Sequence, residues 1–401
     1  MPYSSARATV TDVHIRSSVA GLRGLGRHGT KAIAVGPTWN AAGGWSRYAS
    51  DRVVAPDPAF NRQEFVSALG NLARARGPFF AYPGREEAID AITDASAAEP
   101  RLLAPFPTEA LGALRKKSGL ANLAASVGLR TPPMLRETTV AELSKARIAI
   151  PCAVKPADPV SRMRSTVVVE SRDELDALLR RFCPQERILV QERVSGPVTS
   201  IGLVVSRGGR LCARFHHRVH RTWPVRAGQH ALAVSVPPDE ELVARSARLL
   251  VEAGYWGLAE VEFIYSQNGP VLIDVNPRFY GCLALPLACG VNLPAAWHAA
   301  ALDEALFEPK PYRTGVVYRW FEADLMAALR GSPARLVRRP AGRAIGPMWA
   351  SDDPLPAPLL MGTALATRLR SRWPTGDGGR KRGSWDAAER STGRLSLRRG
   401  G

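Results

Sequence analysis

Residues 257–277 carry the feature that most constrains the fold, which is a strand pair that ends in polar side chains. Two apolar runs flank an Asn-Gly dipeptide at 268–269, a strong short-range signal for the tight turn of a β-hairpin. This turn makes Glu262 and Asp274 neighbours across the two strands. Because side chains alternate along a strand, Asp274 and Asn276 share one face. The pattern therefore predicts a hairpin that gathers three oxygen-bearing side chains at one place.

The three side chains have the chemistry of a metal–phosphate site. Two carboxylates and an amide oxygen are hard ligands, and they suit Mg²⁺, which keeps waters and accepts phosphate oxygens. Arg278 follows Asn276 by two residues and lies on the same side if the strand continues. There a guanidinium would bind a phosphate or a developing acyl phosphate with two hydrogen bonds. The alternative is a simple turn, in which Asp274 and Asn276 bond to the local backbone.

Two other segments place polar groups at the ends of apolar strands. Lys155 interrupts the apolar stretch 152–156, and a lysine inside a buried strand usually needs a partner such as a phosphate. The alternative is a lysine whose ammonium reaches solvent along its apolar stem. Gln191 and Glu192 follow the apolar run 187–190, where they would present polar groups to an adenine edge.

The first 108 residues have the order of an α/β domain. Strand, helix and strand follow one another within residues 8–36, which is typical of a parallel βαβ unit. Gly21, Gly24 and Gly26 fall inside the predicted helix and lack the spacing of a dinucleotide-binding loop. We interpret these glycines as sites of close helix packing.

The charge balance favours anionic partners but is uneven along the chain. There are 54 basic and 36 acidic residues, which give a net charge of +18. Residues 368–401 alone carry ten Lys or Arg against three acidic residues. The part from 374 onward is rich in Gly, Arg, Ser and Thr, and we predict that it is disordered. Because it has little aromatic content, we interpret it as a solvated tail, and nucleic acid is not the partner we expect.

Cysteine and histidine usage indicates a reduced protein without a zinc centre. The five cysteines form no CxxC pair, which predicts inert thiols and a cytoplasmic location. No signal-peptide pattern and no run of about 18 apolar residues is present, so we expect no membrane span. His216, His217 and His220 suggest zinc, but only the first and third share a strand face and no fourth ligand is evident.

Taken in order, these elements resemble the ATP-grasp superfamily, in particular its carboxylate–amine ligases and its carbamoyl-phosphate-synthase-like members. The resemblance covers roughly residues 10–310 and is carried by "RKKSGLANLAASVGLRTPP", "PCAVKPAD", "LVQERVSG", "AEVEFIY" and "VLIDVNPRFYG". It implies an α/β and α+β multidomain chain with the ATP-grasp fold. The implied domains are a Rossmann-like pre-ATP-grasp domain at 1–108, a central lid-bearing subdomain at 109–195, a C-terminal lobe with the metal site at 196–310, an extension at 311–373 and the basic tail at 374–401.

The resemblance also implies residues that bind ATP. Lys117 takes the place of the first nucleotide lysine, and Lys155 takes that of the second, on the α- and β-phosphates. Gln191 lies in the segment that meets adenine. Glu192 lies near adenine N6, and Val194 offers its backbone to the same ring.

The remaining implied residues carry the chemistry. Glu262, Asp274 and Asn276 match the ligands of Mg²⁺, for which Mn²⁺ is an alternative. Arg278 matches the arginine that steadies the transferred phosphoryl group and the acyl phosphate. The implied activity is ATP-dependent ligation of a small-molecule carboxylate to an amine through an acyl phosphate. The sequence does not identify either substrate, and it leaves open whether the chain forms a homo-oligomer.

Two departures from the family keep other functions open. The loop 157–165 has no glycine where the family has a Gly/Ser-rich lid, and we expect Arg162 and Arg164 to contact phosphate instead. Asp274 replaces the commoner glutamate and is one methylene shorter. One alternative is therefore a degenerate ATP-grasp module that binds nucleotide without turnover. The other is a basic nucleic-acid-binding protein.

Overall fold

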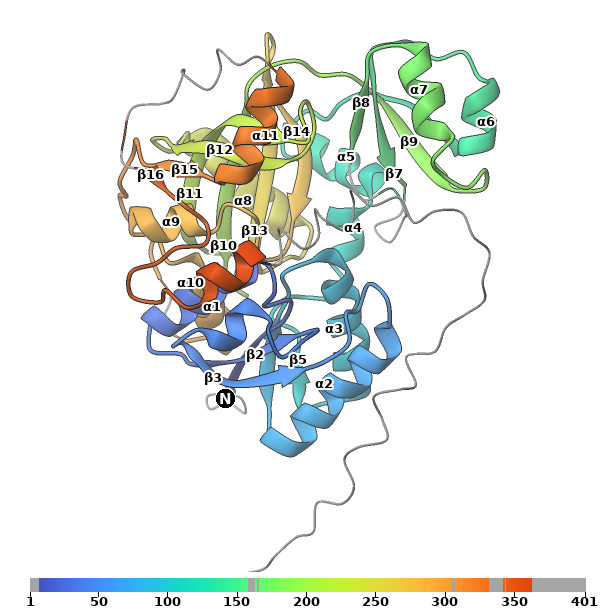
Figure 1. Ribbon diagram of the computed structural model, residues 1–401. Helices are drawn as coiled ribbons and strands as arrows, with labels where there is room; N and C mark the ends of the chain where they lie inside the picture. The colour runs from blue at the N-terminus through green and yellow to red at the C-terminus, as the bar shows by residue number, and fades with distance from the viewer. Residues whose placement is uncertain are drawn as a thin grey trace, which may run out of the picture. The chain divides into compact units, whose positions relative to one another are not determined.

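The structure is a computed structural model that describes residues 7–157, 163, 166–304, 307–331, 342 and 344–362 (Figure 1). The chain divides into a compact unit at 1–361 and a second unit at 362–401, and the account below concerns the first. The predicted tail at 374–401 and the two lid arginines, Arg162 and Arg164, lie outside the described residues.

The first sheet is parallel and has the strand order β3-β2-β1-β4-β5, which is that of a Rossmann-like domain. The predicted βαβ unit is confirmed as β1, α1 and β2. The strands are β1 Arg7–Val10, β2 Ala32–Gly36, β3 Ala49–Val54, β4 Phe79–Tyr82 and β5 Leu102–Leu103. The helices of this part are α1 Arg16–Arg27, α2 Arg62–Arg76 and α3 Glu86–Ala98, with a short 3-10 turn at Ala42–Trp45.

The second sheet is antiparallel, has the order β6-β9-β7-β8, and contains its own small hydrophobic core. Its strands are β6 Met134–Thr139, β7 Cys152–Pro156, β8 Val167–Val169 and β9 Arg187–Glu192. Helices α6 Val140–Lys145 and α7 Arg172–Leu179 pack on this sheet (Figure 1). Helices α4 Leu111–Arg115 and α5 Lys117–Ser126 precede it in the chain.

The third sheet has seven strands in the order β14-β13-β10-β11-β12-β15-β16, and all pairs except the last are antiparallel. Its strands are β10 Val198–Val205, β11 Leu211–Trp223, β12 Gln229–Ser235, β13 Gly257–Ser266, β14 Gly269–Asn276, β15 Val317–Arg319 and β16 Ala344–Ile345. The helices that accompany it are α8 Glu240–Glu252, α9 Ala284–Cys289, α10 Leu293–Leu302 and α11 Phe321–Gly331.

The predicted hairpin is confirmed as β13 and β14, with Glu262 directly opposite Asp274. The first three predicted domain ranges contain one sheet each. Strands β15 and β16 fall in the range that we assigned to an extension, 311–373, yet they complete the third sheet. The boundary at 310 therefore does not separate two sheets, and the division into domains stays a prediction.

Helix α1 packs on the segment that follows β14, and the close approach is possible because glycines of α1 have no side chain at the contact. A Cβ added at Gly21 would lie 2.3 Å from the Phe279 ring, and one at Gly24 would lie 2.6 Å from Pro294. The interpretation of these glycines as packing sites is therefore confirmed. Phe279 follows Arg278, so the packing of α1 fixes the backbone beside the predicted site.

Two further predictions from the sequence concern the cysteines and membrane-spanning segments. Four of the five cysteines, Cys152, Cys212, Cys282 and Cys289, are buried thiols, and Cys183 is exposed. Within the described ranges, every helix is too short or too polar to cross a lipid bilayer.

We predict that Gly21→Ala lowers the free energy of unfolding by about 1–3 kcal/mol, because the new methyl group overlaps Phe279 in a packed core. Gly112→Ala is the matched control, since no heavy atom lies within 4 Å of an added Cβ there. It should leave stability unchanged or raise it by up to about 1 kcal/mol. Urea unfolding of both variants measures the difference, and equal values would contradict the packing argument.

Candidate functional site

All nine residues predicted for the site line one cavity of about 1390 Å³. Its walls come from all three sheets and their loops: Gly84 and Arg85 follow β4, Lys155 lies on β7, and Glu262 lies on β13. The cavity therefore brings together segments that are far apart in sequence.

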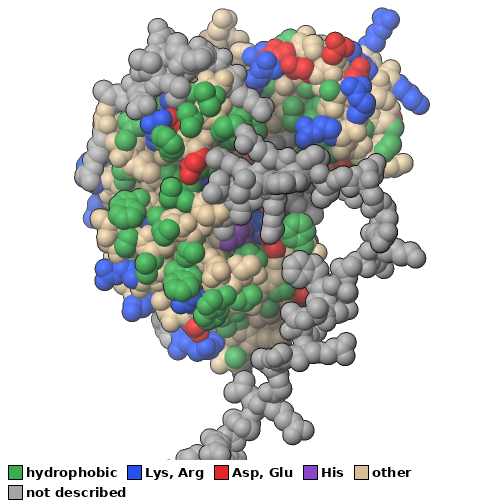
Figure 2. Space-filling model, viewed as in Figure 1, with side chains coloured by type: hydrophobic (Ala, Val, Ile, Leu, Met, Phe, Trp, Pro, Cys, Tyr) green, Lys and Arg blue, Asp and Glu red, His purple; other side chains and the backbone are tan. Residues whose placement is uncertain are grey.

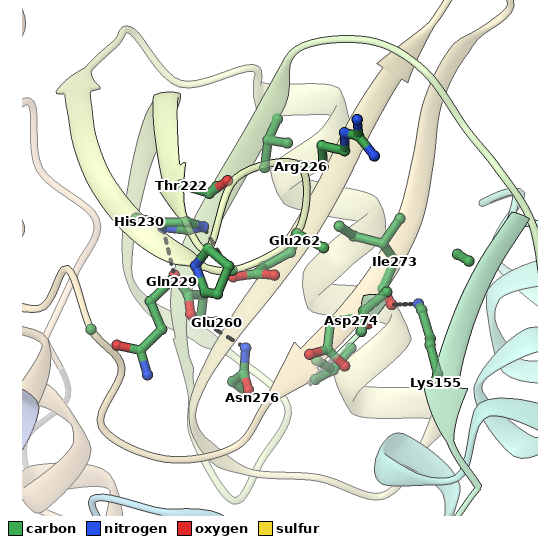
Figure 3. A pocket seen from close by; sticks show the side chains of 18 of the residues that line it. Lys155, Thr222, Arg226, Gln229, His230, Glu260, Glu262, Ile273, Asp274 and Asn276 are labelled. Atoms are coloured by element: carbon green, nitrogen blue, oxygen red, sulfur yellow. Dashed lines mark hydrogen bonds and ion pairs between the residues drawn. The ribbon is translucent and has the colours of Figure 1, made fainter. Parts of the chain in front are cut away.

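The acidic floor of the cavity is formed by facing residues of β13 and β14. Glu262 pairs with Asp274, and Glu260 pairs with Asn276 across the hairpin. Figure 3 shows these four side chains gathered at one side of the two strands. Asn276 Nδ2 donates to Glu260 Oε2 at 3.4 Å. Glu260 was missed from the sequence, although it precedes Glu262 by two residues and strand alternation places both on one face.

Both predicted lysines reach β14 from other elements. Lys117, the first residue of α5, forms an ion pair with Asp274 Oδ1. Lys155 Nζ donates to the carbonyl oxygen of Ile273 at 3.2 Å. The Lys155 side chain is only 7% exposed, so the alternative of a lysine that reaches solvent is wrong. Burial and the nearby Lys117 ammonium lower the pKa of Lys155 to about 8, against the opposing effect of Asp274 and Glu262.

Arg278 lies beside Asn276, as the sequence predicted. Its Nη2 donates to Asn276 Oδ1 at 2.9 Å, and its Nε donates to Glu86 Oε1 at 2.8 Å. Burial opposes the charge on Arg278, but Glu86, together with the more distant Glu260 and Asp274, raises its pKa above the ordinary value. The guanidinium therefore stays positive and is held at the end of β14.

Glu86 and Arg115 were missed from the sequence, and both belong to the site. Glu86 begins α3 and accepts hydrogen bonds from Arg278 and Arg115, each at 2.8 Å. Arg115 also bonds to Asp90. No local pattern identifies these partners, because 192 residues separate Glu86 from Arg278. The sequence signal that could have indicated Glu86 is the charged run at 85–87, which closely follows a strand.

His230 of β12 joins the acidic floor from a third direction. Its Nε2 lies 3.2 Å from Glu262 Oε1, and its Nδ1 lies 3.9 Å from Glu260 Oε1 (Figure 3). Burial and the charge of Glu262 raise the pKa of Glu260 to about 7. Burial alone would lower the pKa of His230, but Cys282 and Glu262 hold it well above its usual value. The imidazole thus offsets part of the negative charge.

The three histidines that suggested zinc do not assemble in the part of the chain that the structure describes. His216 bonds to Thr199 and accepts the Asp239 backbone N–H. His217 Nε2 instead lies 3.3 Å from His230 Nδ1. The possible ligand atoms of these two histidines and of Cys282 lie within 4.8 Å of one another.

The segment predicted to meet adenine lines the same cavity. Gln191 is buried, and its Oε1 has no hydrogen-bond partner among the described residues. The Glu192 backbone N–H donates to Pro133 O at 2.9 Å, while its side chain is exposed. Val194 follows β9 and also lines the cavity. The unsatisfied Gln191 oxygen is an acceptor that suits an incoming N–H donor.

The oxygen donors of the floor fit a divalent cation such as Mg²⁺. Glu260 is buried, and burial together with the charge of Glu262 raises its pKa. A bound cation would favour the ionised form of Glu260. Carboxylate and amide oxygens are also the donor set that Mg²⁺ prefers.

Comparison with known proteins shows similarity to ATP-grasp proteins. Residues 184–323 match the family described as ATP-grasp in the biosynthetic pathway with Ter operon. A D-alanine–D-alanine ligase of Corynebacterium aurimucosum is 26% identical over 155 residues, which cover 35% of this chain and 44% of the ligase. The chain spans about half the length of the curated relatives it matches, from 44% to 55%.

Solved structures agree on the fold. The biotin carboxylase of Campylobacter jejuni, solved as a β,γ-ATP complex, has a TM-score of 0.62 at 14% identity and covers 79% of this chain and 75% of its own. An L-amino acid ligase from Bacillus licheniformis has a TM-score of 0.60 at 18% identity and covers 75% of each chain. The chain therefore has the ATP-grasp fold, and the resemblance to that superfamily drawn from the sequence is confirmed.

We predict that Glu86→Ala lowers the free energy of unfolding by about 1.5–3 kcal/mol, because it removes a charged hydrogen-bond acceptor from Arg278 and Arg115. The matched control is Asp94→Ala, whose ion pair with Arg62 is 42% and 49% exposed. That exposed pair should contribute less than about 1 kcal/mol. Urea unfolding of both variants measures the two losses, and a larger loss for Asp94→Ala would contradict the central position of Glu86.

Proposed function

We propose that this chain, which has the ATP-grasp fold, is an ATP-dependent ligase that joins a carboxylate to an amine through an acyl phosphate. One observation carries the proposal: Lys117 and Lys155 converge on β14 at the place where Asp274 faces Glu262. Two ammonium groups beside an acidic floor are the arrangement that a metal-bound triphosphate requires.

The adenine end of the nucleotide would lie along β9 and the residues after it. The unsatisfied Gln191 Oε1 is a suitable acceptor for the adenine amino group. Glu192 and Val194 line the same wall of the cavity and would offer polar and backbone groups to the ring. Lys155 lies between this wall and β14, so its ammonium would contact the α- and β-phosphates.

Glu262, Asp274 and Asn276 would hold Mg²⁺ or Mn²⁺, with Glu260 as a further oxygen donor. When bound, the cation neutralises charge on the phosphate oxygens. Without it, the protein partly offsets the acidic floor with Lys117 and His230. These two cationic side chains would keep the carboxylates oriented until the nucleotide arrives.

The reaction would proceed in two steps. A carboxylate oxygen attacks the γ-phosphorus, the bond from phosphorus to the bridging oxygen breaks, and ADP leaves with an acyl phosphate formed. The amine nitrogen then attacks the acyl carbon, the acyl C–O bond breaks, phosphate leaves, and the nitrogen loses a proton. Arg278, fixed by Glu86 and Asn276, would stabilise the charge on the transferred phosphoryl group. Positioning and charge neutralisation account for this chemistry without a protein nucleophile.

A nucleotide-binding module without turnover is a second candidate. The absence of glycine from 157–165 favours it, because a lid of backbone N–H groups normally shields the acyl phosphate from water. Nucleic-acid binding has less support. Figure 2 shows acidic and basic side chains intermingled over the second sheet and its helices, where Arg187 pairs with Glu137 and Arg193 pairs with Glu170.

We predict that ADP release over a panel of carboxylates and amines identifies at least one productive pair. Asp274→Ala should lower that rate at least about 100-fold, because it removes a metal ligand and the partner of Lys117. Asp94→Ala, whose carboxylate lies outside the cavity, is the control and should retain the wild-type rate. Tight ATP binding with no release for any pair would reject the ligase in favour of the binding module.

We also predict that ATP affinity falls as the pH rises above about 8. Lys155 in the free protein loses its proton near that pH, while bound phosphates favour the charged ammonium. The Kd for ATP should therefore rise by up to about tenfold per pH unit above this point. Isothermal titration calorimetry from pH 7 to 9.5 measures the slope. Lys155→Arg should bind ATP with little pH dependence, and the same slope in this variant would assign the titration to another group.

A further inference from the structure

One arginine of the cavity wall differs from the others in its partners. Six described arginines line the cavity, and five of them pair with carboxylates. These five pairs are Arg85 with Asp12 and Asp57, Arg115 with Glu86 and Asp90, Arg193 with Glu170, Arg226 with Glu174, and Arg278 with Glu86. Arg16 has no carboxylate partner among the residues that the structure describes. Its positive charge is therefore not offset by an acidic side chain.

Neutral groups hold the Arg16 guanidinium in a fixed orientation. Its Nε donates to the Tyr318 hydroxyl at 3.2 Å, and its Nη2 donates to Gln229 Oε1 at 2.7 Å. The guanidinium carbon lies 3.6 Å from the centre of the Trp320 ring, which is stacking distance. These contacts use two of its five N–H donors, so the others remain for a ligand in the cavity.

The backbone opposite Arg16 leaves room for the guanidinium. A Cβ added at Gly281 would lie 2.9 Å from Arg16 Nη2, so the guanidinium would have to shift. Gly281 follows Arg278 by three residues, on the segment that leaves β14. Arg278 therefore belongs to the same short segment that Arg16 contacts from α1.

The hydrogen bond to Gln229 indicates on which side of the cavity Arg16 lies. Figure 3 shows Gln229, the partner of Arg16, on the opposite side of Glu260 and Asn276 from Lys155. The metal-ligand face thus separates the phosphate-binding lysine from the Gln229 side of the cavity. A ligand group bound by Arg16 would belong to a substrate other than ATP.

The start of α1 adds to the positive potential at this place. Arg16 is the first residue of the helix, no acidic residue lies in the first turn, and no side chain caps it. The positive end of the helix dipole therefore reinforces the guanidinium charge.

We infer that Arg16 binds the α-carboxylate of an amino acid that supplies the amine. The inference rests on the proposed ligase function. The carboxylate that is activated loses its charge when its oxygen bonds to phosphorus, so it needs no permanent counter-ion. A fixed and unpaired guanidinium suits a carboxylate that stays intact through both steps. A bidentate arginine–carboxylate pair also orients the amino group toward the acyl carbon next to Arg278.

Calorimetric titration tests this assignment. The full chain, saturated with Mg²⁺ and β,γ-methylene-ATP, is titrated with the standard amino acids and with the carboxamide of each. At least one free amino acid should bind at least about tenfold more tightly than its carboxamide, since a hydrogen bond between two charged groups is stronger than one to a neutral group. Arg16→Met should bring this ratio close to one without changing the affinity for the ATP analogue.

Arg207→Met is the matched control, because Arg207 also stacks on an indole, 3.8 Å from the centre of Trp256, and lies outside the cavity. It should leave the ratio unchanged.

Gly281→Ala is a second variant, to be used if Arg16→Met does not fold. It retains the guanidinium but crowds it, so it should also weaken amino acid binding. Binding of the ATP analogue with no amino acid bound, or Arg16-dependent binding of succinate alone, would overturn the inference while the ligase proposal stands. Loss of nucleotide binding in the wild type would reject both.

Discussion

The concentration of negative charge on one side of the β13–β14 hairpin is the constraint on which the rest of the cavity depends. Cross-strand register places Glu262 opposite Asp274 and Glu260 opposite Asn276. Burial and the charge of Glu262 raise the pKa of Glu260, so nearby cations favour its ionised form. The surrounding structure supplies cationic groups: Lys117 on Asp274, His230 on Glu262 and Arg278 on Asn276. Under the proposed function, a metal-bound phosphate would replace some of these contacts.

The cationic groups come from different elements, so the site exists only when the three sheets are assembled. Lys155 belongs to the second sheet, while His230 belongs to the third. The first sheet contributes through Glu86, which holds Arg278, and through α1, whose close packing on Phe279 fixes the following backbone. A change in any of the three parts is therefore transmitted to the end of β14. This explains why the glycines of α1, which are remote from the chemistry in sequence, matter to the site.

Local patterns were sufficient for the hairpin, the βαβ unit and Lys155, because alternation, turn residues and a charge inside an apolar run are all short-range signals. Glu260 was accessible by the same alternation rule and was overlooked. Glu86, His230 and Arg16 were not accessible, since each contacts partners far from it in sequence and the chain has 54 basic and 36 acidic residues to pair. Strands β15 and β16 have three and two residues, which is too short for any periodicity to show.

The cavity arginines differ in their partners. Under the proposed function, this difference indicates which arginine binds an anion that persists and which meets charge only during the reaction. A guanidinium that already binds a carboxylate has part of its charge neutralised, so it gains less from an incoming anion than one with neutral partners. Arg278 shares Glu86 with Arg115. Under the proposed function, this arrangement suits a group that meets charge only while phosphoryl transfer proceeds. Arg16 is held by Tyr318, Gln229 and Trp320 and keeps its full charge. Under the proposed function, a permanent anion would therefore gain most from binding at Arg16, whereas Arg278 would accommodate transient charge.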